Sequence, residues 1–450
     1  MPRVVVAGGG WAGCAAALAA RQAGAEAALL ERTDMLLGTG LVGGIMRNNG
    51  RFTAAEEMSA LGGGRLFALS DSVARHRNLD FAGHRHAWLY DVARIEPLVR
   101  RTLQAAGVEV HLLSRVTAVQ REGERIEAVH TADGGTYYGQ AFVDATGTAG
   151  PPANCRRYGN GCAMCIYRCP AFGGRLGLAA LAGIKEYAAL RRGGGRGAMS
   201  GSCKLHKGSL APWLVKELET QGMVVLPVPP DLPGKDEMLR RKACQQYNLP
   251  EYAANIILLD TGPAKLMAPF YPLEALRRVS GLENARFEDP YAGGSGNSIR
   301  FLAMPPRDDA LQVQGLSNVF CAGERAGPFV GHTEAIVTGT LAGHNAARLA
   351  AGMEPVVLPS SLASGDIIAF TRRQVEKGDG LYQRFTFSGS VYFERMQSLN
   401  LYTTDREEIR KRTGDLAGIF ATPVIIEVGS EQEAGSRRQE AGKTARMPNK

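Results

Sequence analysis

Long apolar runs are absent from this 450-residue sequence. No stretch reaches about 18 consecutive apolar residues, so we expect no membrane-spanning helix. The first apolar strand begins at Arg3 and leaves no room for a signal peptide, so we expect a cytoplasmic protein. A serine-hydrolase elbow, a Walker loop and a zinc-protease helix are also missing, which excludes those enzyme classes.

The charge is positive but is not arranged as RNA-binding surfaces require. The formal net charge is +8, which suits either a nucleic acid or an anionic cofactor as ligand. Aromatic and basic residues do not alternate in any patch, so the sequence favours the anionic cofactor. The tail over residues 431–450 is basic and nearly free of apolar residues, and we expect it to be disordered.

Glycine is abundant. The chain has 56 glycines, and many lie in segments that we expect to be loops approaching a cofactor. Apolar residues make up 45% and charged residues 21%, as in ordinary globular proteins. The length suits two or three domains.

The most informative segment is RVVVAGGGWAGCAAALAARQAGAEAALLER, residues 3–32. It predicts a strand, a tight turn, a helix and a second strand. Gly8 permits the turn, Gly10 lets the backbone approach a pyrophosphate, and Gly13 lets helix and strand pack closely. Glu31 stands where an acid binds the ribose hydroxyls. An ordinary glycine-rich turn is the alternative, but the complete unit favours dinucleotide binding.

Helical and strand patterns continue after this unit. Residues 38–44 form a glycine-rich loop. We expect helices over 53–70 and 91–106, and strands over 108–113, 115–123, 125–135 and 136–146. The strands form a small meander that returns to a parallel sheet.

Two later segments resemble further motifs of FAD-dependent oxidoreductases. A strand ends in Ala145-Thr146-Gly147, and another ends in Gly323-Glu324. In those proteins the glutamate binds the ribityl chain. A small-residue helix after Gly331 then directs its N-terminus at the flavin N1–O2 edge, where negative charge develops on reduction.

The segment from Gly323 to Asn345 is similar to the signature of the GidA and TrmFO-type tRNA-modifying flavoproteins, and Ala60-Leu61-Gly62-Gly63 resembles that branch too. Heterodisulfide-reductase-like FAD oxidoreductases, which pair flavin with iron–sulfur clusters, are the other relatives. The resemblance covers about half the chain and omits residues 151–285.

The resemblance implies an α/β fold, with an FAD-binding Rossmann-like doubly wound parallel sheet, a β-meander and an inserted substrate or cap domain. We expect FAD-binding parts at 1–150 and 286–354, the insertion at 151–285, and an accessory region at 355–430. The expected FAD-binding residues are Gly8, Gly10, Trp11, Ala12, Gly13, Glu31, Arg32, Val116, Thr146, Gly147, Gly323, Glu324, His332, Thr333 and Ala335.

The sequence departs from the tRNA-modifying branch in two places. Those enzymes carry a cysteine in the loop after the second strand, and Gly40-Leu41-Val42-Gly43-Gly44 has none. The long helical tRNA-binding extension is also missing. We therefore expect a small-molecule substrate or an electron-transfer partner protein; tRNA is the less favoured partner, and homo-oligomerisation stays open. With one complete nucleotide fingerprint, a second NAD(P)H-binding domain is not expected.

Four cysteines lie close together. Cys155, Cys162, Cys165 and Cys169 follow the spacing C-x6-C-x2-C-x3-C-P, part of which resembles a bacterial ferredoxin segment that holds a [4Fe–4S] cluster. We favour such a cluster coupled to the flavin. A structural zinc site, a redox disulfide between Cys162 and Cys165, and cysteines without a ligand role are the alternatives.

Two further residues are candidates for catalysis. Cys203 is followed by Lys204, His206 and Lys207, and nearby cations would lower the pKa of a thiol. A solvated basic loop is the favoured interpretation of this segment. His332 stands at the expected helix start beside the flavin, where it would stabilise reduced flavin or move a proton. Simple packing against the cofactor is the alternative.

Overall fold

A parallel five-stranded sheet forms the centre of the protein. The computed structural model describes residues 1–147, 171–190, 198–199, 203–232, 239, 248–267, 272–288, 299–300 and 302–425. The strand order is β19-β10-β1-β2-β6, and all neighbours are parallel. The strands are β1 (Arg3–Ala7), β2 (Glu26–Leu30), β6 (Glu109–His111), β10 (Ala141–Asp144) and β19 (Val319–Cys321).

Apolar runs explain why these strands occupy the middle of the fold. Val4, Val5 and Val6 of β1 are fully buried, as are Phe142 and Val143 of β10. Strands buried on both faces are typical of parallel sheets covered by helices. The predicted doubly wound α/β architecture is confirmed.

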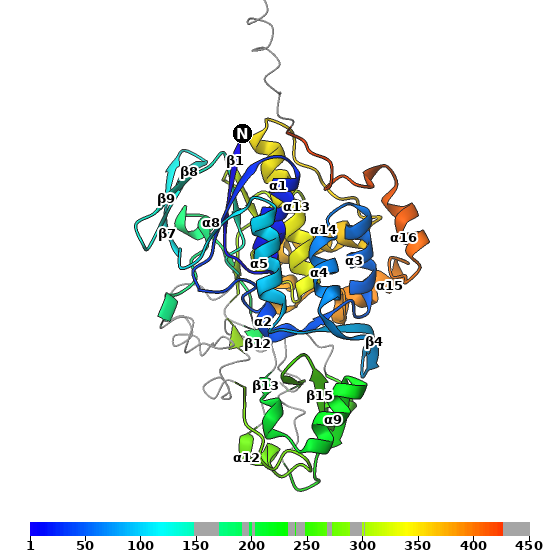
Figure 1. Cartoon of the computed structure of the whole chain (residues 1–450). Coiled ribbons are helices and arrows are strands. Elements are labelled where there is room, and N and C mark those ends of the chain that lie inside the picture. Colours follow the sequence, from blue (N-terminus) through cyan, green and yellow to red (C-terminus); the bar gives the residue numbers. More distant parts are fainter. Residues whose placement is uncertain are drawn as a thin grey trace, which may run out of the picture.

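Two small-residue helices cover one face of the sheet side by side (Figure 1). They are α1 (Trp11–Gln22) and α13 (His332–Ala350). A Cβ atom at Gly339 would lie 2.2 Å from the carbonyl oxygen of Ala12, and one at Gly343 would lie 2.0 Å from that of Ala16. The helix backbones therefore touch, which only glycine permits at these two positions.

The predicted helix over 53–70 is wrong in one respect, because the structure has two helices there. They are α3 (Gly50–Ala60) and α4 (Arg65–Ser72). Gly62 separates them with φ +90°, a left-handed conformation that ends a helix. The helix predicted over 91–106 is α5 (Ile95–Ala105), which begins later than expected.

The predicted meander is confirmed, and a second antiparallel sheet was not predicted. The meander consists of β7 (Val116–Glu122), β8 (Arg125–Thr131) and β9 (Thr136–Tyr138). The unpredicted sheet pairs β3 (Ile45–Met46) with the hairpin of β4 (Ala74–Phe81) and β5 (His84–Tyr90). Irregular register in that hairpin hides its alternation in the sequence.

The inserted region has an antiparallel sheet of its own and extends from one end of the molecule (Figure 1). The strand order is β13-β16-β15-β14, and a separate apolar cluster packs beneath the sheet. The elements are β13 (Cys203–Leu205), η1 (Lys207–Ser209), α9 (Pro212–Gln221), β14 (Met223–Pro227), α11 (Pro250–Ala254), β15 (Asn255–Asp260), β16 (Ala264–Leu266) and α12 (Leu273–Leu276). The domain boundaries expected from the sequence stay predictions.

The C-terminal helices share the main core. Phe385, Tyr392 and Phe420 are buried in the same apolar cluster as β1 and α1. The remaining elements are α2 (Gly40–Gly43), α8 (Leu178–Leu181), β11 (Tyr187–Ala188), β12 (Ala198–Met199), β17 (Ile299–Arg300), β18 (Ala303–Met304), η4 (Gly323–Arg325), α14 (Ala363–Glu376), η5 (Asp379–Tyr382), α15 (Ser390–Ser398), α16 (Arg406–Thr413) and η6 (Gly414–Leu416). Within the described ranges, each helix is too short or too polar to cross a membrane.

A buried histidine in α13 makes the stability of the fold depend on pH. His344 is fully buried against Phe420, and neither ring nitrogen has a hydrogen-bond partner among the described residues. Burial lowers the pKa of His344 to about 4, and the nearby Arg348 acts in the same direction.

We expect a His344→Leu variant to lose part of the acid sensitivity of the wild type. Between pH 6.5 and pH 4 the unfolded state binds a proton at His344 and the native state does not, so the free energy of unfolding falls as the pH falls. The loss reaches about 3 kcal/mol at pH 4. Urea unfolding of both proteins from pH 7 to pH 4 measures it, and parallel pH profiles would contradict the assignment.

Candidate functional site

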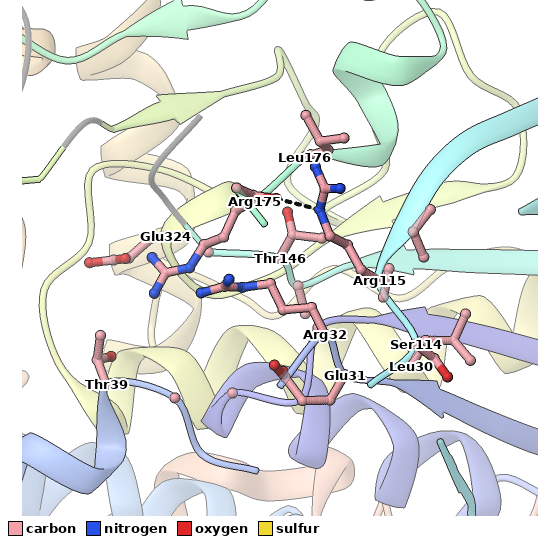
Figure 2. Close-up of a pocket in the computed structure, with 18 residues that line it drawn as sticks. Leu30, Glu31, Arg32, Thr39, Ser114, Arg115, Thr146, Arg175, Leu176 and Glu324 are labelled. Atoms are coloured by element: carbon pink, nitrogen blue, oxygen red, sulfur yellow. Dashed lines mark hydrogen bonds between the residues drawn. The ribbon is translucent and has the colours of Figure 1, made fainter. Parts of the chain in front are cut away.

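A cavity opens at the carboxyl ends of β1, β2 and β10. Its empty volume, including the part open to solvent, is about 660 Å³. Figure 2 shows its lining side chains. The lining residues are Ala7, Gly8, Gly10, Leu30, Glu31, Arg32, Gly38, Thr39, Ser114, Arg115, Val116, Ala145, Thr146, Gly147, Gly174, Arg175, Leu176 and Glu324.

The three glycines of the first turn have different surroundings. A Cβ atom at Gly13 would lie 1.7 Å from the carbonyl oxygen of Gly8, and one at Gly8 would lie 2.4 Å from that of Ala145. A Cβ atom at Gly10 would meet no atom within 4 Å, so this glycine borders open space. Gly8 and Gly13 are therefore required by packing, and Gly10 faces the cavity.

The start of α1 is suited to an anion. Gly10 is its N-cap residue, with no side-chain cap, and the first turn contains no acidic residue. The helix dipole places partial positive charge at this end. A pyrophosphate in the cavity would lie against it.

Glu31 directly follows β2 and lines the cavity (Figure 2). One carboxylate oxygen accepts a hydrogen bond from the Gly9 amide at 2.7 Å. The other accepts bonds from the amide and the hydroxyl of Thr33, each at 2.9 Å. The oxygen that bonds the Gly9 amide has capacity for a further donor. Glu31 therefore fixes the glycine turn and can still accept a bond from a bound ribose.

Three arginines surround the cavity, and only Arg32 was expected. Arg32 donates to the carbonyl of Gly173 at 2.5 Å, and Arg115 donates to that of Gly174 at 2.7 Å. Arg175 follows directly, and Figure 2 shows its side chain near that of Arg32. The arginines hold the segment over 173–176 against the cavity and give it positive charge, which suits a diphosphate.

The strand ends that carry the second and third motifs are joined by a buried ion pair. Arg325 of η4 donates to Asp144 at the end of β10 at 3.2 Å, and it also bonds Glu186. Asp144 accepts a hydrogen bond from the hydroxyl of Thr146 at 2.7 Å. This network positions Thr146 and Glu324, which both line the cavity.

Beside the cavity, three aromatic rings meet around α2. The ring centroids of Trp11 and Tyr90 are 6.0 Å apart, and the His332 ring lies 6.3 Å from Trp11 and 6.1 Å from Tyr90. A Cβ atom at Gly43 would overlap the His332 ring. Gly43 is therefore required by the imidazole that packs against it, and Gly40 by the indole of Trp11.

Two lysines of the inserted domain also bond α2. Lys204 donates to the carbonyl of Leu41 at 2.9 Å, and Lys265 donates to that of Val42 at 3.0 Å. The two lysines are partners across β13 and β16. The inserted domain therefore contacts the same short helix that contacts His332.

The residues expected to bind the cofactor fall into two groups, those that line the cavity and those that do not. Those lining the cavity are Gly8, Gly10, Glu31, Arg32, Val116, Thr146, Gly147 and Glu324. The other expected residues are not among the lining residues: Trp11, Ala12, Gly13, Gly323, His332, Thr333 and Ala335. Ser114, Arg115 and Arg175 also line the cavity but were not expected from the sequence, because no motif marks them. Arg175 also belongs to a segment assigned to the inserted domain.

The cysteine predictions fall largely outside the described residues. Cys155, Cys162, Cys165 and Cys169 lie in residues 148–170, and nothing is described of the Cys203 side chain. Lys207, expected near that thiol, pairs with Asp260 at 2.6 Å. No group of three His, Cys, Asp or Glu side chains suited to a metal occurs in the described parts.

The described thiols are poor nucleophiles. Cys14 and Cys321 are buried and form no disulfide. Burial raises the pKa of Cys321 to about 12, and it raises the pKa of Cys14 well above its usual range. A protonated buried thiol does not attack a substrate.

Comparison with known proteins identifies the family to which this chain belongs. The family model described as "Glucose inhibited division protein A" (GIDA) matches residues 3–205 and 267–354. The chain belongs to the GidA family. The match includes every predicted cofactor-binding residue and β13 of the inserted domain.

The curated relatives of this GidA-family chain carry the names of enzymes that methylate tRNA. The methylenetetrahydrofolate–tRNA-(uracil-5-)-methyltransferase TrmFO of Crocosphaera subtropica is 38% identical over 95 residues, which is 21% of this chain and 20% of the relative. The TrmFO of Synechococcus elongatus is 43% identical over 63 residues, 14% of this chain and 13% of the relative. The alignments thus span a fifth or less of these relatives.

The fold matches a solved GidA structure over nearly the whole chain. The Aquifex aeolicus GidA form II crystal structure superposes with a TM-score of 0.66 at 16% identity, covering 98% of this chain and 76% of that chain. The predicted resemblance to GidA and TrmFO-type FAD-dependent proteins is confirmed. Family membership implies FAD as the cofactor.

Proposed function

We propose that this chain is an FAD-dependent oxidoreductase that binds FAD in the cavity at the start of α1. The open space at Gly10 carries the proposal, because a diphosphate placed there meets the helix N-terminus and the three arginines. Glu31 would accept the ribose hydroxyls, and Glu324 stands where the third motif binds the ribityl chain. Bound FAD would supply hydride or electron transfer.

The contacts of α2 support a substrate site on the inserted domain. His332 packs against Gly43 of α2, and Lys204 and Lys265 donate to carbonyls of the same helix. A substrate held by the inserted domain would therefore be close to residues that adjoin the cofactor cavity. A small molecule and an electron-transfer protein both suit this arrangement.

Spectroscopy of the purified protein tests the FAD proposal. We expect flavin absorbance as isolated, or after incubation with FAD, at one FAD per chain. Protein that is colourless and gains no flavin from added FAD would refute it.

Modification of tRNA is the second candidate, and the names of the TrmFO relatives favour it over iron–sulfur coupling. Such an enzyme would bind tRNA with an affinity that falls steeply with salt, because phosphate contacts release counterions. The absence of a cysteine from α2 argues against the uridine chemistry of that branch. We expect no submicromolar tRNA binding at physiological salt in gel-shift titrations. Submicromolar, salt-sensitive binding would instead favour the tRNA candidate.

The [4Fe–4S] cluster stays a prediction from cysteine spacing. Metal analysis of anaerobically purified protein decides between it and the alternatives. About four irons per chain would support the cluster, and about one zinc would support a structural site.

A further inference from the structure

A hydrogen-bond chain links α2, β5 and the start of α13. Tyr90 of β5 donates its hydroxyl to the carbonyl of Gly40 at 2.6 Å. The same hydroxyl oxygen lies 3.2 Å from Nδ1 of His332. Tyr90 is fully buried, and His332 is partly exposed.

This geometry determines where the imidazole carries its hydrogen. A carbonyl oxygen only accepts, so the single hydroxyl hydrogen of Tyr90 is used in the bond to Gly40. Burial raises the pKa of Tyr90 above its usual range, so the hydroxyl keeps that hydrogen at neutral pH. The bond to His332 then forms only if Nδ1 is the donor.

We propose that Tyr90 is a positioning residue that holds neutral His332 in its Nδ1–H form and so makes Nε2 the nitrogen that exchanges a proton at the flavin site. Cε1 is the ring atom nearest to where a Cβ atom of Gly43 would stand, with Nε2 at 2.5 Å and Nδ1 at 2.7 Å from that position, so the ring edge that carries both nitrogens faces α2. The role at the flavin rests on the proposed function. If bound FAD accepted a hydride from a substrate, Nε2 would accept the proton that the substrate loses and would release it to solvent, while Nδ1 would keep its hydrogen.

Several charged groups lie near the segment that carries this ring. Arg51 of α3 and Glu334 of α13 pair with each other beside Gly331, the residue before His332. Lys204 and Lys265 bond the α2 backbone from the inserted domain. Trp11 of α1 adds an uncharged ring. The tautomer of His332 must therefore be measured by spectroscopy of the ring nitrogens, because a pH profile alone does not identify it.

Nitrogen NMR of histidine-labelled protein, with and without FAD, tests the proposal. We expect the wild-type neutral His332 ring, assigned with a His332→Asn variant, to carry its hydrogen on Nδ1. In Tyr90→Phe the ratio of Nδ1–H to Nε2–H should fall about 2- to 10-fold, the range that one net hydrogen bond corresponds to. Tyr392→Phe is the matched control, because Tyr392 is also fully buried and donates to a backbone carbonyl, that of Ala363, at 2.9 Å.

The outcomes separate the tautomer from the flavin role. A wild-type hydrogen on Nε2, or a ratio unchanged in Tyr90→Phe, would overturn the assignment, and the wild-type spectrum decides even if the variant does not fold. In protein that binds FAD, Tyr90→Phe and not Tyr392→Phe should alter how the flavin midpoint potential varies with pH. If the midpoint potential depends on pH equally in both variants, the proposed proton transfer at Nε2 is refuted. The assignment of the tautomer is not affected by that result. If no FAD binds, the proposed function fails and the tautomer result still stands.

Discussion

Replacing Gly10 with valine will abolish FAD binding and leave the fold intact. Gly10 has φ −67° and ψ −179°, an extended conformation that valine adopts without strain. The space beside it is empty, so the fold accommodates the side chain. That space is where the diphosphate would lie, and we expect FAD affinity to fall by at least about 100-fold, or about 2.7 kcal/mol.

Gly13→Ala is the informative comparison for this variant. Its Cβ atom would lie 1.7 Å from the Gly8 carbonyl oxygen, so the turn and α1 must separate. We expect it to lower the free energy of unfolding of FAD-free protein by at least ~2 kcal/mol, whereas Gly10→Val should change it by less than ~1 kcal/mol. Isothermal titration with FAD and urea unfolding measure both quantities. Full FAD binding by Gly10→Val would place the diphosphate elsewhere.

The part of the site that could be predicted from the sequence is the part that backbone geometry requires. Gly8 has φ +101°, and a Cβ atom at Gly13 would overlap a carbonyl oxygen. Each position therefore requires glycine, and the spacing between the two is visible in the sequence. Glu31 is similarly constrained because it ends β2 and binds the turn. These requirements act within about thirty residues, and a sequence pattern can express them.

The residues that were missed depend on contacts between distant segments. Arg115 lies directly before β7, and Arg175 lies in the segment over residues 171–177, yet both line the cavity. Any arginine pattern that marks them would also occur on ordinary surfaces. Tyr90 was missed for the same reason: its bonds join β5 to α2 and α13, and the hairpin that carries it has an irregular register.

A second expected result concerns the buried ion pair that holds the start of α13. Arg51→Met should lower the free energy of unfolding by about 3–5 kcal/mol, because it leaves Glu334 buried without its countercharge. The two side chains are 7% and 0% exposed, with Nε and Oε1 3.2 Å apart. Arg51 also donates to the carbonyl of Val330 at 3.0 Å. Its loss therefore frees the segment that leads into His332.

A double-mutant cycle separates the charge effect from lost packing. Adding Glu334→Gln to Arg51→Met removes the unpaired charge while keeping acceptors for the Thr386 hydroxyl and the Phe387 amide, so we expect it to restore part of the loss. Arg85→Met is the control, because the Arg85–Asp80 pair is exposed, with side chains 72% and 47% accessible, and should contribute less than about 1 kcal/mol. Urea unfolding of the wild type, Arg51→Met, Glu334→Gln and the double variant gives the coupling energy. Equal losses in Arg51→Met and Arg85→Met would show that the buried pair does not hold α13 in place.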